Sequence, residues 1–114
     1  MWWMSRLTIM LTSLFLSFTL ASSAYAADIT MGSGGNLVFE PNEITISAGE
    51  TVTITNGDLP PHNFVVADHP ELSHPDLAFV GGESFGVTFD KPGDYEFQCE
   101  PHAGAGMKGV VHVK

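Results

Sequence analysis

Short runs of alternating apolar and polar residues, separated by turn residues, dominate the sequence from residue 29 onward. In residues 43–47 Ile44 and Ile46 share one face, and in residues 51–55 Val52 and Ile54 do the same. A period of two predicts half-buried β-strands, and no long stretch repeats with the period of a helix. The alternation therefore restricts the chain to an all-β fold.

Strands of the same kind are predicted at residues 29–31, 37–40, 63–67, 85–89, 95–99 and 109–114. In the last of them Val111 and Val113 are expected to face inward and His112 outward. About eight strands at this spacing are typical of a Greek-key β-sandwich. The predicted fold is therefore a two-layer sandwich without helices of any length.

Residues 68–78 interrupt this pattern. Pro70 and Pro75 lie in the segment, and a proline fixes φ and removes a backbone donor. We expect the two prolines to break any strand and to leave at most a short helix. His69 and His74 also lie here, and we interpret them as solvated loop side chains, because a second metal site is the rarer explanation.

The N-terminus has the layout of a secretory signal peptide. Residues 1–6 contain the only Arg, residues 7–20 form an apolar run without a charge, and small residues follow up to Ala26. The run is shorter than the roughly 20 residues that span a bilayer, which favours cleavage over a membrane anchor. We therefore predict a cleaved signal peptide at residues 1–26 and one domain at residues 27–114.

The charge of this domain limits its partners. Three lysines oppose 13 acidic residues after residue 26, so the net charge is about −10 and nucleic acid is an unsuitable partner. A basic protein partner fits this charge. Solubility alone would also explain it.

Cys99 is the only cysteine of the chain, so no internal disulfide can stabilise the exported domain. Cys99 is the first residue of a loop that also contains His102 and Met107. Gly104 and Gly106, between these two residues, allow a tight turn. His62, at the start of a predicted strand, is the best-placed fourth ligand. Two His, one thiolate and an axial Met form the ligand set of a blue-copper electron-transfer site. Structural zinc sites, the main competitor, prefer Cys and His in paired spacings.

Three other functions deserve comparison. Cys99 and a His could form the nucleophile and base of a thiol hydrolase, but the small size and the Met leave no substrate cleft, so no enzymatic activity is expected. A module that stores or delivers copper would favour an open, Met-rich site. The third alternative keeps the electron transfer and changes the partner, for example to a terminal oxidase.

Motifs along nearly all of residues 27–114 resemble the plastocyanin family, and the Glu-Pro pair between Cys99 and His102 is similar to cyanobacterial members. The motifs are Phe39-Glu40-Pro41, Gly49-Glu50-Thr51, Pro61-His62-Asn63, Gly82-Glu83-Ser84-Phe85, Pro92-Gly93-Asp94-Tyr95 and the stretch from Cys99 to Gly109. The resemblance implies a cupredoxin-like domain that binds one copper ion, as Cu⁺ or Cu²⁺. Its implied ligands are His62, Cys99, His102 and Met107.

Plastocyanins carry electrons from cytochrome f to photosystem I in the thylakoid lumen. The resemblance thus implies a mobile, monomeric carrier in that lumen or in a periplasm, peripheral to the membrane at most. It also implies a hydrogen bond from Asn63 to the Cys99 loop. A docking patch around the exposed edge of His102 is implied for Gly35, Leu37, Pro61 and Ala103.

The sequence departs from the family at three places. Gln98 stands where plastocyanins usually have a Tyr before the ligand Cys, so the side route for electrons is in question. Ala103 stands where cyanobacterial relatives often have an Arg aimed at the partner. The segment between His62 and Cys99 is shorter than usual, and we expect the missing residues to fall within residues 68–78. Any acidic docking patch that relatives have in this segment is therefore expected to be reduced.

Overall fold

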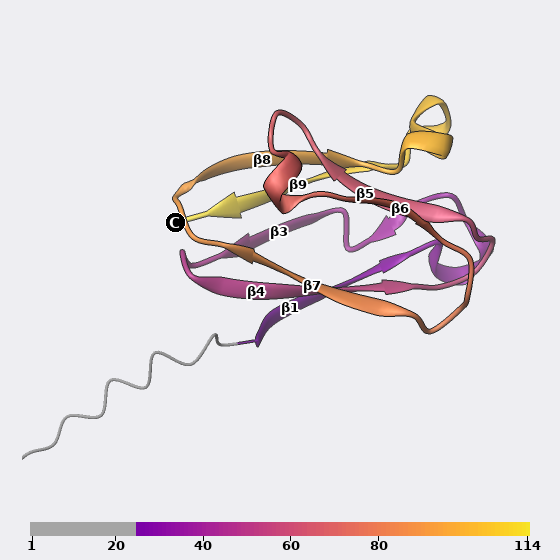
Figure 1. Cartoon of the computed structure of the whole chain (residues 1–114), viewed down its shortest axis with the longest axis horizontal. Helices are drawn as coiled ribbons and strands as arrows, with labels where there is room; N and C mark the ends of the chain where they lie inside the picture. Colours follow the sequence, from indigo (N-terminus) through magenta and orange to yellow (C-terminus); the bar gives the residue numbers. More distant parts are fainter. Residues whose placement is uncertain (1–24) are drawn as a thin grey trace, which may run out of the picture.

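The computed structural model describes residues 25–114, which form two β-sheets packed face to face (Figure 1). The elements, with η for a short 3-10 helix, are β1 (Tyr25–Met31), η1 (Ser33–Gly35), β2 (Phe39–Glu40), β3 (Glu43–Ile46), β4 (Glu50–Asn56), β5 (His62–Val66), η2 (Pro70–Leu72), β6 (His74–Ala78), β7 (Ser84–Phe89), β8 (Gly93–Gln98), η3 (Glu100–Ala105) and β9 (Lys108–Val113). One sheet has the strand order β2-β1-β4-β7 and the other β3-β9-β8-β5-β6. The all-β sandwich predicted from the sequence is confirmed.

The period-two pattern determines which side of each strand is buried. On β4 Val52 and Ile54 are fully buried, and on β9 Val111 and Val113 are buried while His112 is half-buried on the opposite face. Two pairings, β1 with β4 and β3 with β9, are parallel, and the others are antiparallel. The burial pattern of β9 confirms that Val111 and Val113 face inward and that His112 faces outward, as predicted.

Three phenylalanines join the two sheets in the core. Phe39 comes from β2, whereas Phe64 and Phe97 come from β5 and β8 of the other sheet. Phe39 meets Phe97 edge-on with ring centroids 4.8 Å apart, and the ring centroids of Phe64 and Phe97 are also 4.8 Å apart. Since His62 lies two residues before Phe64 and Cys99 two residues after Phe97, these aromatic anchors fix the strand ends that carry both side chains.

The prediction that prolines would break any strand in residues 68–78 is wrong for its second half. A short helix, η2, begins at Pro70, as expected, but Pro75 lies inside β6. The proline is tolerated within this strand because β6 is the last strand of its sheet, where one edge needs no backbone donors. Pro75 also contributes as an acceptor, since its carbonyl receives a hydrogen bond from the Asn63 side chain at 3.0 Å.

The predicted leader, residues 1–26, lies outside the described residues except for its last two positions, which belong to β1. Its cleavage stays a prediction. Within residues 25–114 no helix has the length and the apolar composition needed to cross a membrane.

Candidate metal centre

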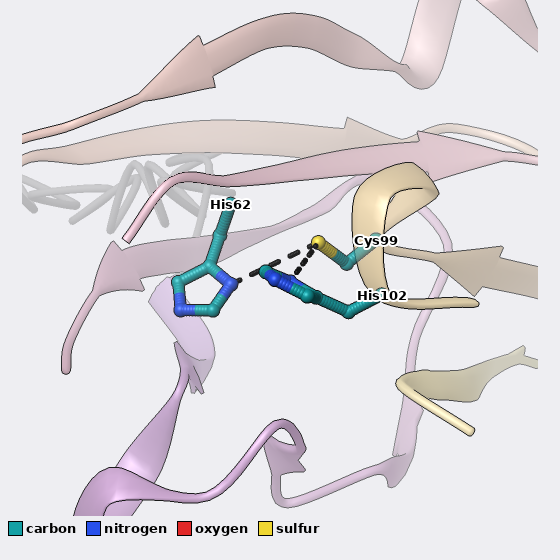
Figure 2. Close-up of side chains that lie close together, drawn as sticks. All are labelled: His62, Cys99 and His102. Carbon is teal, nitrogen blue, oxygen red and sulfur yellow. Dashed lines mark hydrogen bonds between the residues drawn. The ribbon is translucent and has the colours of Figure 1, made fainter. Parts of the chain in front are cut away.

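Three side chains from two separate segments of the sequence converge at one end of the sandwich. Figure 2 shows His62, from β5, facing Cys99 and His102 from the β8–β9 connection. The Sγ atom of Cys99 lies 3.8 Å from Nδ1 of His62 and 3.4 Å from Nδ1 of His102. His62 and Cys99 are fully buried, and His102 is half-buried. They are the one group of at least three His, Cys, Asp or Glu side chains within residues 25–114 that could hold a metal ion.

These separations match a metal with three ligands in a plane. Bonds of about 2.0 Å to nitrogen and about 2.3 Å to sulfur, 120° apart, would place the sulfur about 3.7 Å from each nitrogen. The observed distances of 3.4 and 3.8 Å bracket that value. One thiol and two imidazoles in a trigonal arrangement are the donor set of a blue-copper site, so the residues present fit a copper ion.

A backbone carbonyl fixes the tautomer of His62. Nε2 of this ring lies 2.7 Å from the carbonyl oxygen of Asp58, which can only accept, so Nε2 carries the proton. Nδ1 of the neutral ring therefore presents a lone pair toward Cys99. Gly32 lies against the same carbonyl and ring, with a positive φ of 76°, and leaves no room for a Cβ atom. Gly32 and Asp58 together hold the ring in place.

Cys99 follows directly after β8 and precedes η3. Burial raises the pKa of its thiol, although hydrogen bonds from the backbone amides of Asn63 and His102 act in the opposite direction. The metal-free sulfur is therefore protonated at neutral pH. A bound metal would displace this proton and stabilise the thiolate.

The η3 helix folds the remaining residues of the loop back toward Cys99. The amide of His102 donates to the carbonyl of Cys99 at 3.1 Å, and the amide of Cys99 donates to the carbonyl of Met107 at 3.1 Å. Gly106 closes the helix with φ 87°, a conformation that glycine adopts without strain. Met107 is fully buried, so its thioether is held inside the same end of the fold.

Asn63 connects the strand of His62 to the loop of Cys99. Its Oδ1 accepts from the amide of Glu100 at 2.8 Å, and its Nδ2 donates to the Glu100 carboxylate at 3.0 Å. The second hydrogen of Nδ2 reaches Pro75 on β6. The hydrogen bond implied for Asn63 is thus present, and it has a further partner on the edge strand.

The four residues expected to form a docking patch have mixed exposure. Gly35 is exposed, while Leu37, Pro61 and Ala103 are half-buried, and Leu37 packs against the hydrophobic core. The docking role of all four stays a proposal.

The other two histidines of residues 68–78 have local partners, and the expectation of a loop is wrong for His74, which begins β6. His69 lies 2.8 Å from the Glu71 carboxylate, and His74 stacks on Phe85 with ring centroids 3.9 Å apart. Neither belongs to a cluster of metal-binding side chains within the described part of the chain.

Sequence reasoning missed Gly32, Asp58 and the side chain of Glu100. The one available signal was the glycine-rich run 32–35, which was not interpreted, and it does not identify His62 as the neighbour. Asp58 acts through its backbone carbonyl, which leaves no sequence signal.

A β-sandwich that presents two imidazoles and one thiol at trigonal spacing defines a class of single-metal binding protein. The family model described as copper binding proteins, plastocyanin/azurin family, matches residues 26–114. The chain therefore belongs to the plastocyanin/azurin family of copper-binding proteins.

Individual relatives agree with this assignment. The chain is 46% identical to chloroplastic plastocyanin of Hordeum vulgare over 103 residues, and 46% identical to plastocyanin of Scenedesmus fuscus over 98 residues. The first match covers 82% of this chain and 66% of the relative, and the second covers 76% and 100%. Oxidized plastocyanin of the fern Dryopteris crassirhizoma superimposes with a TM-score of 0.68 at 36% identity, over 76% of this chain and 99% of the fern chain.

The chain spans about two thirds of the length of some chloroplastic relatives, namely 66% for Hordeum vulgare and 63% for Physcomitrium patens.

Proposed function

We propose that this protein is a mobile one-electron carrier, with a copper ion held by His62, Cys99, His102 and Met107. The observation that carries the proposal is the trigonal spacing of one Sγ and two Nδ1 atoms in a buried site. Copper at such a site supplies the redox step by alternating between Cu(II) and Cu(I), one electron at a time.

The residues of the site suit electron transfer better than catalysis. His62 and Cys99 are completely buried, and the hydrogen bonds of Asp58 and Asn63 brace them against movement. A braced site limits the rearrangement that accompanies each electron. His102 is half-buried, so its ring is the ligand best placed to pass an electron to a partner at the surface. Met107, buried at the same end of the fold, would supply a fourth ligand to a bound copper, and no ligand position would then be left open for a substrate.

Copper delivery, the alternative from a different class, requires release of Cu(I). The burial of Cys99, His62 and Met107 argues against rapid release, because the metal would have to leave a closed interior. Transfer of Cu(I) to a competing chelator within seconds would favour delivery. Retention over hours would favour the electron carrier.

The partners follow from family resemblance. We propose cytochrome f as the donor and photosystem I as the acceptor, with a monomer acting in the thylakoid lumen or a periplasm and at most peripheral to the membrane. The identity of 46% to plastocyanins supports this choice. Gln98 and Ala103, which replace residues usual in that family, keep another acceptor such as a terminal oxidase as the alternative.

The visible spectrum and a redox titration of the copper-loaded protein test the central proposal. An intense blue band that bleaches reversibly with one electron per protein is expected. A colourless Cu(II) protein, or one that needs two electrons, would contradict the blue-copper assignment.

The docking proposal predicts that an apolar contact matters more than any single acidic residue. Reaction with a basic redox partner should slow as salt screens the acidic surface, with a Debye length of about 10 Å at 0.1 M. Leu37→Ala should reduce the rate several-fold by removing part of the apolar contact, and Asp76→Asn should change it by less than about twofold. Stopped-flow oxidation of the reduced protein across a salt series measures both. A large effect of Asp76→Asn with Leu37→Ala silent would indicate a discrete acidic docking patch instead.

The leader proposal predicts a mature protein that starts at Ala27. Cleavage after Ala26 would remove Trp2, Trp3 and Tyr25, so the mature protein would contain Tyr95 as its single Tyr and no Trp. Its emission should be weak and tyrosine-like, and its mass should correspond to residues 27–114. Tryptophan emission from protein purified out of its native compartment would show that the leader remains attached.

A further inference from the structure

The outer face of the five-stranded sheet carries a histidine between two carboxylates. His112 on β9 lies with Nδ1 2.7 Å from Oδ1 of Asp94 and with Nε2 2.8 Å from Oε1 of Glu43. Asp94 belongs to β8 and Glu43 to β3, the strands on either side of β9. One side chain thus contacts both neighbouring strands.

This geometry requires a charged ring. An ionised carboxylate can only accept a hydrogen bond, and a neutral imidazole has a single N–H to donate. Both contacts can be hydrogen bonds only when both ring nitrogens carry protons. At any pH at which the carboxylates are ionised, the complete arrangement therefore belongs to the imidazolium form.

The surrounding charges favour that form. Asp94 lies directly across from His112 on one side, and the uncharged Thr45 lies across on the other. By strand alternation the other ionisable side chains on this face of β8 and β9 are Glu96 and Lys108, and Lys114 follows the end of β9. The hydrogen bonds and charges of Asp94 and Glu43 raise the pKa of His112 above its usual value.

We propose that Glu43, Asp94 and His112 form a proton-dependent clamp that ties β3, β9 and β8 together and strengthens the fold as the pH falls. Two of these strands flank the metal-site loop, because β8 ends just before Cys99 and β9 begins just after Met107. Figure 1 shows the C-terminal end of β9 at the opposite end of the sandwich from η3. The clamp acts on the same strand pair without touching the metal ligands.

The sign of the effect follows from the raised pKa. A group that binds its proton more tightly in the folded state than in the unfolded state stabilises the fold at low pH. The contribution is fully present below about 6.5, the value for free histidine, and it disappears as the pH rises through the higher folded-state value.

Proton NMR of the reduced, copper-loaded protein tests the clamp directly. The His112 ring resonances should titrate with a midpoint above that of free histidine, and either Asp94→Asn or Glu43→Gln should lower the midpoint. In urea unfolding, the wild type should be more resistant than His112→Gln below pH 6.5, and this difference should vanish at high pH. Because the clamp is remote from the metal ligands, the metal-free protein should give the same differences.

His69→Gln is the matched control, since His69 has one carboxylate partner, Glu71, and joins no pair of strands. This variant should leave the titration midpoint of His112 unchanged. A His112 midpoint at or below that of free histidine would overturn the proposal. So would a stability difference between wild type and His112→Gln that is constant from pH 5 to 9. If the Gln variant does not fold, the midpoints of the two carboxylate variants still decide the question.

Discussion

Replacing Cys99 by Ser is expected to abolish the blue absorption of the copper-loaded protein almost completely. The band requires charge transfer from a thiolate to Cu(II), and the hydroxyl of Ser neither ionises at neutral pH nor donates charge as sulfur does. Cys99 is the single cysteine of the chain, so no other residue can replace it. An absorption spectrum of the variant after addition of Cu(II) measures the effect. Retention of the band would remove Cys99 from the ligand set.

Met107→Leu serves as the control for this experiment. As the proposed axial ligand, the Met107 thioether would bind copper weakly and tune the site, so the variant should keep its blue colour and change its reduction potential. Leu fills a similar volume in the buried position of Met107, and the cost in folding stability should stay below about 1.5 kcal/mol. An unchanged potential would show that Met107 is not axial.

Gly32→Ala is expected to weaken both the fold and copper binding. The new Cβ would overlap the carbonyl oxygen of Asp58 and lie 2.5 Å from Nε2 of His62. Overpacking typically costs about 1–3 kcal/mol, and an L-residue at φ 76° adds roughly 1–2 kcal/mol. Displacing the carbonyl that orients His62 should also reduce copper affinity about 10- to 100-fold. Urea unfolding of the metal-free protein and competition with a chelator measure the two effects separately.

Gly35→Ala provides the matched comparison, because Gly35 has almost the same φ of 77° but no atom near the added Cβ. It should show only the backbone cost and should leave copper affinity unchanged. Equal losses of affinity in the two variants would mean that backbone strain, and not the contact with His62, is responsible.

Local pattern made most of the fold predictable. Alternation in β4 and β9 identified both the strands and their buried faces, because burial of every second side chain is what drives strand pairing. Pro75 was misjudged because its cost depends on whether the strand is internal or at an edge, and strand order is not a local property. The contacts of His112 could not be predicted for the same reason, because its two carboxylate partners lie 69 and 18 residues away in sequence.

The ligands of the candidate site could be predicted from the sequence, but the contacts that support them could not. The loop from Cys99 to Met107 brings its ligand types together in sequence, so it could be recognised directly. His62 was assigned from its position at a strand start, and the structure brings it beside Cys99. The supporting contacts of Gly32 and Asp58 depend on a backbone carbonyl and on close packing, and neither can be predicted from the residue type.

The proline within β6 also bears on how the molecule behaves in a crowded solution. An unpaired strand edge offers backbone groups to which a strand of another chain can add, and this is a common route to aggregation. β6 ends its sheet, and it presents Pro75, which lacks an amide hydrogen, followed by the exposed charge of Asp76. Proline and exposed charge are two of the features by which edge strands discourage such pairing, so the residue that made this strand hard to predict also suits it to the edge of a sheet.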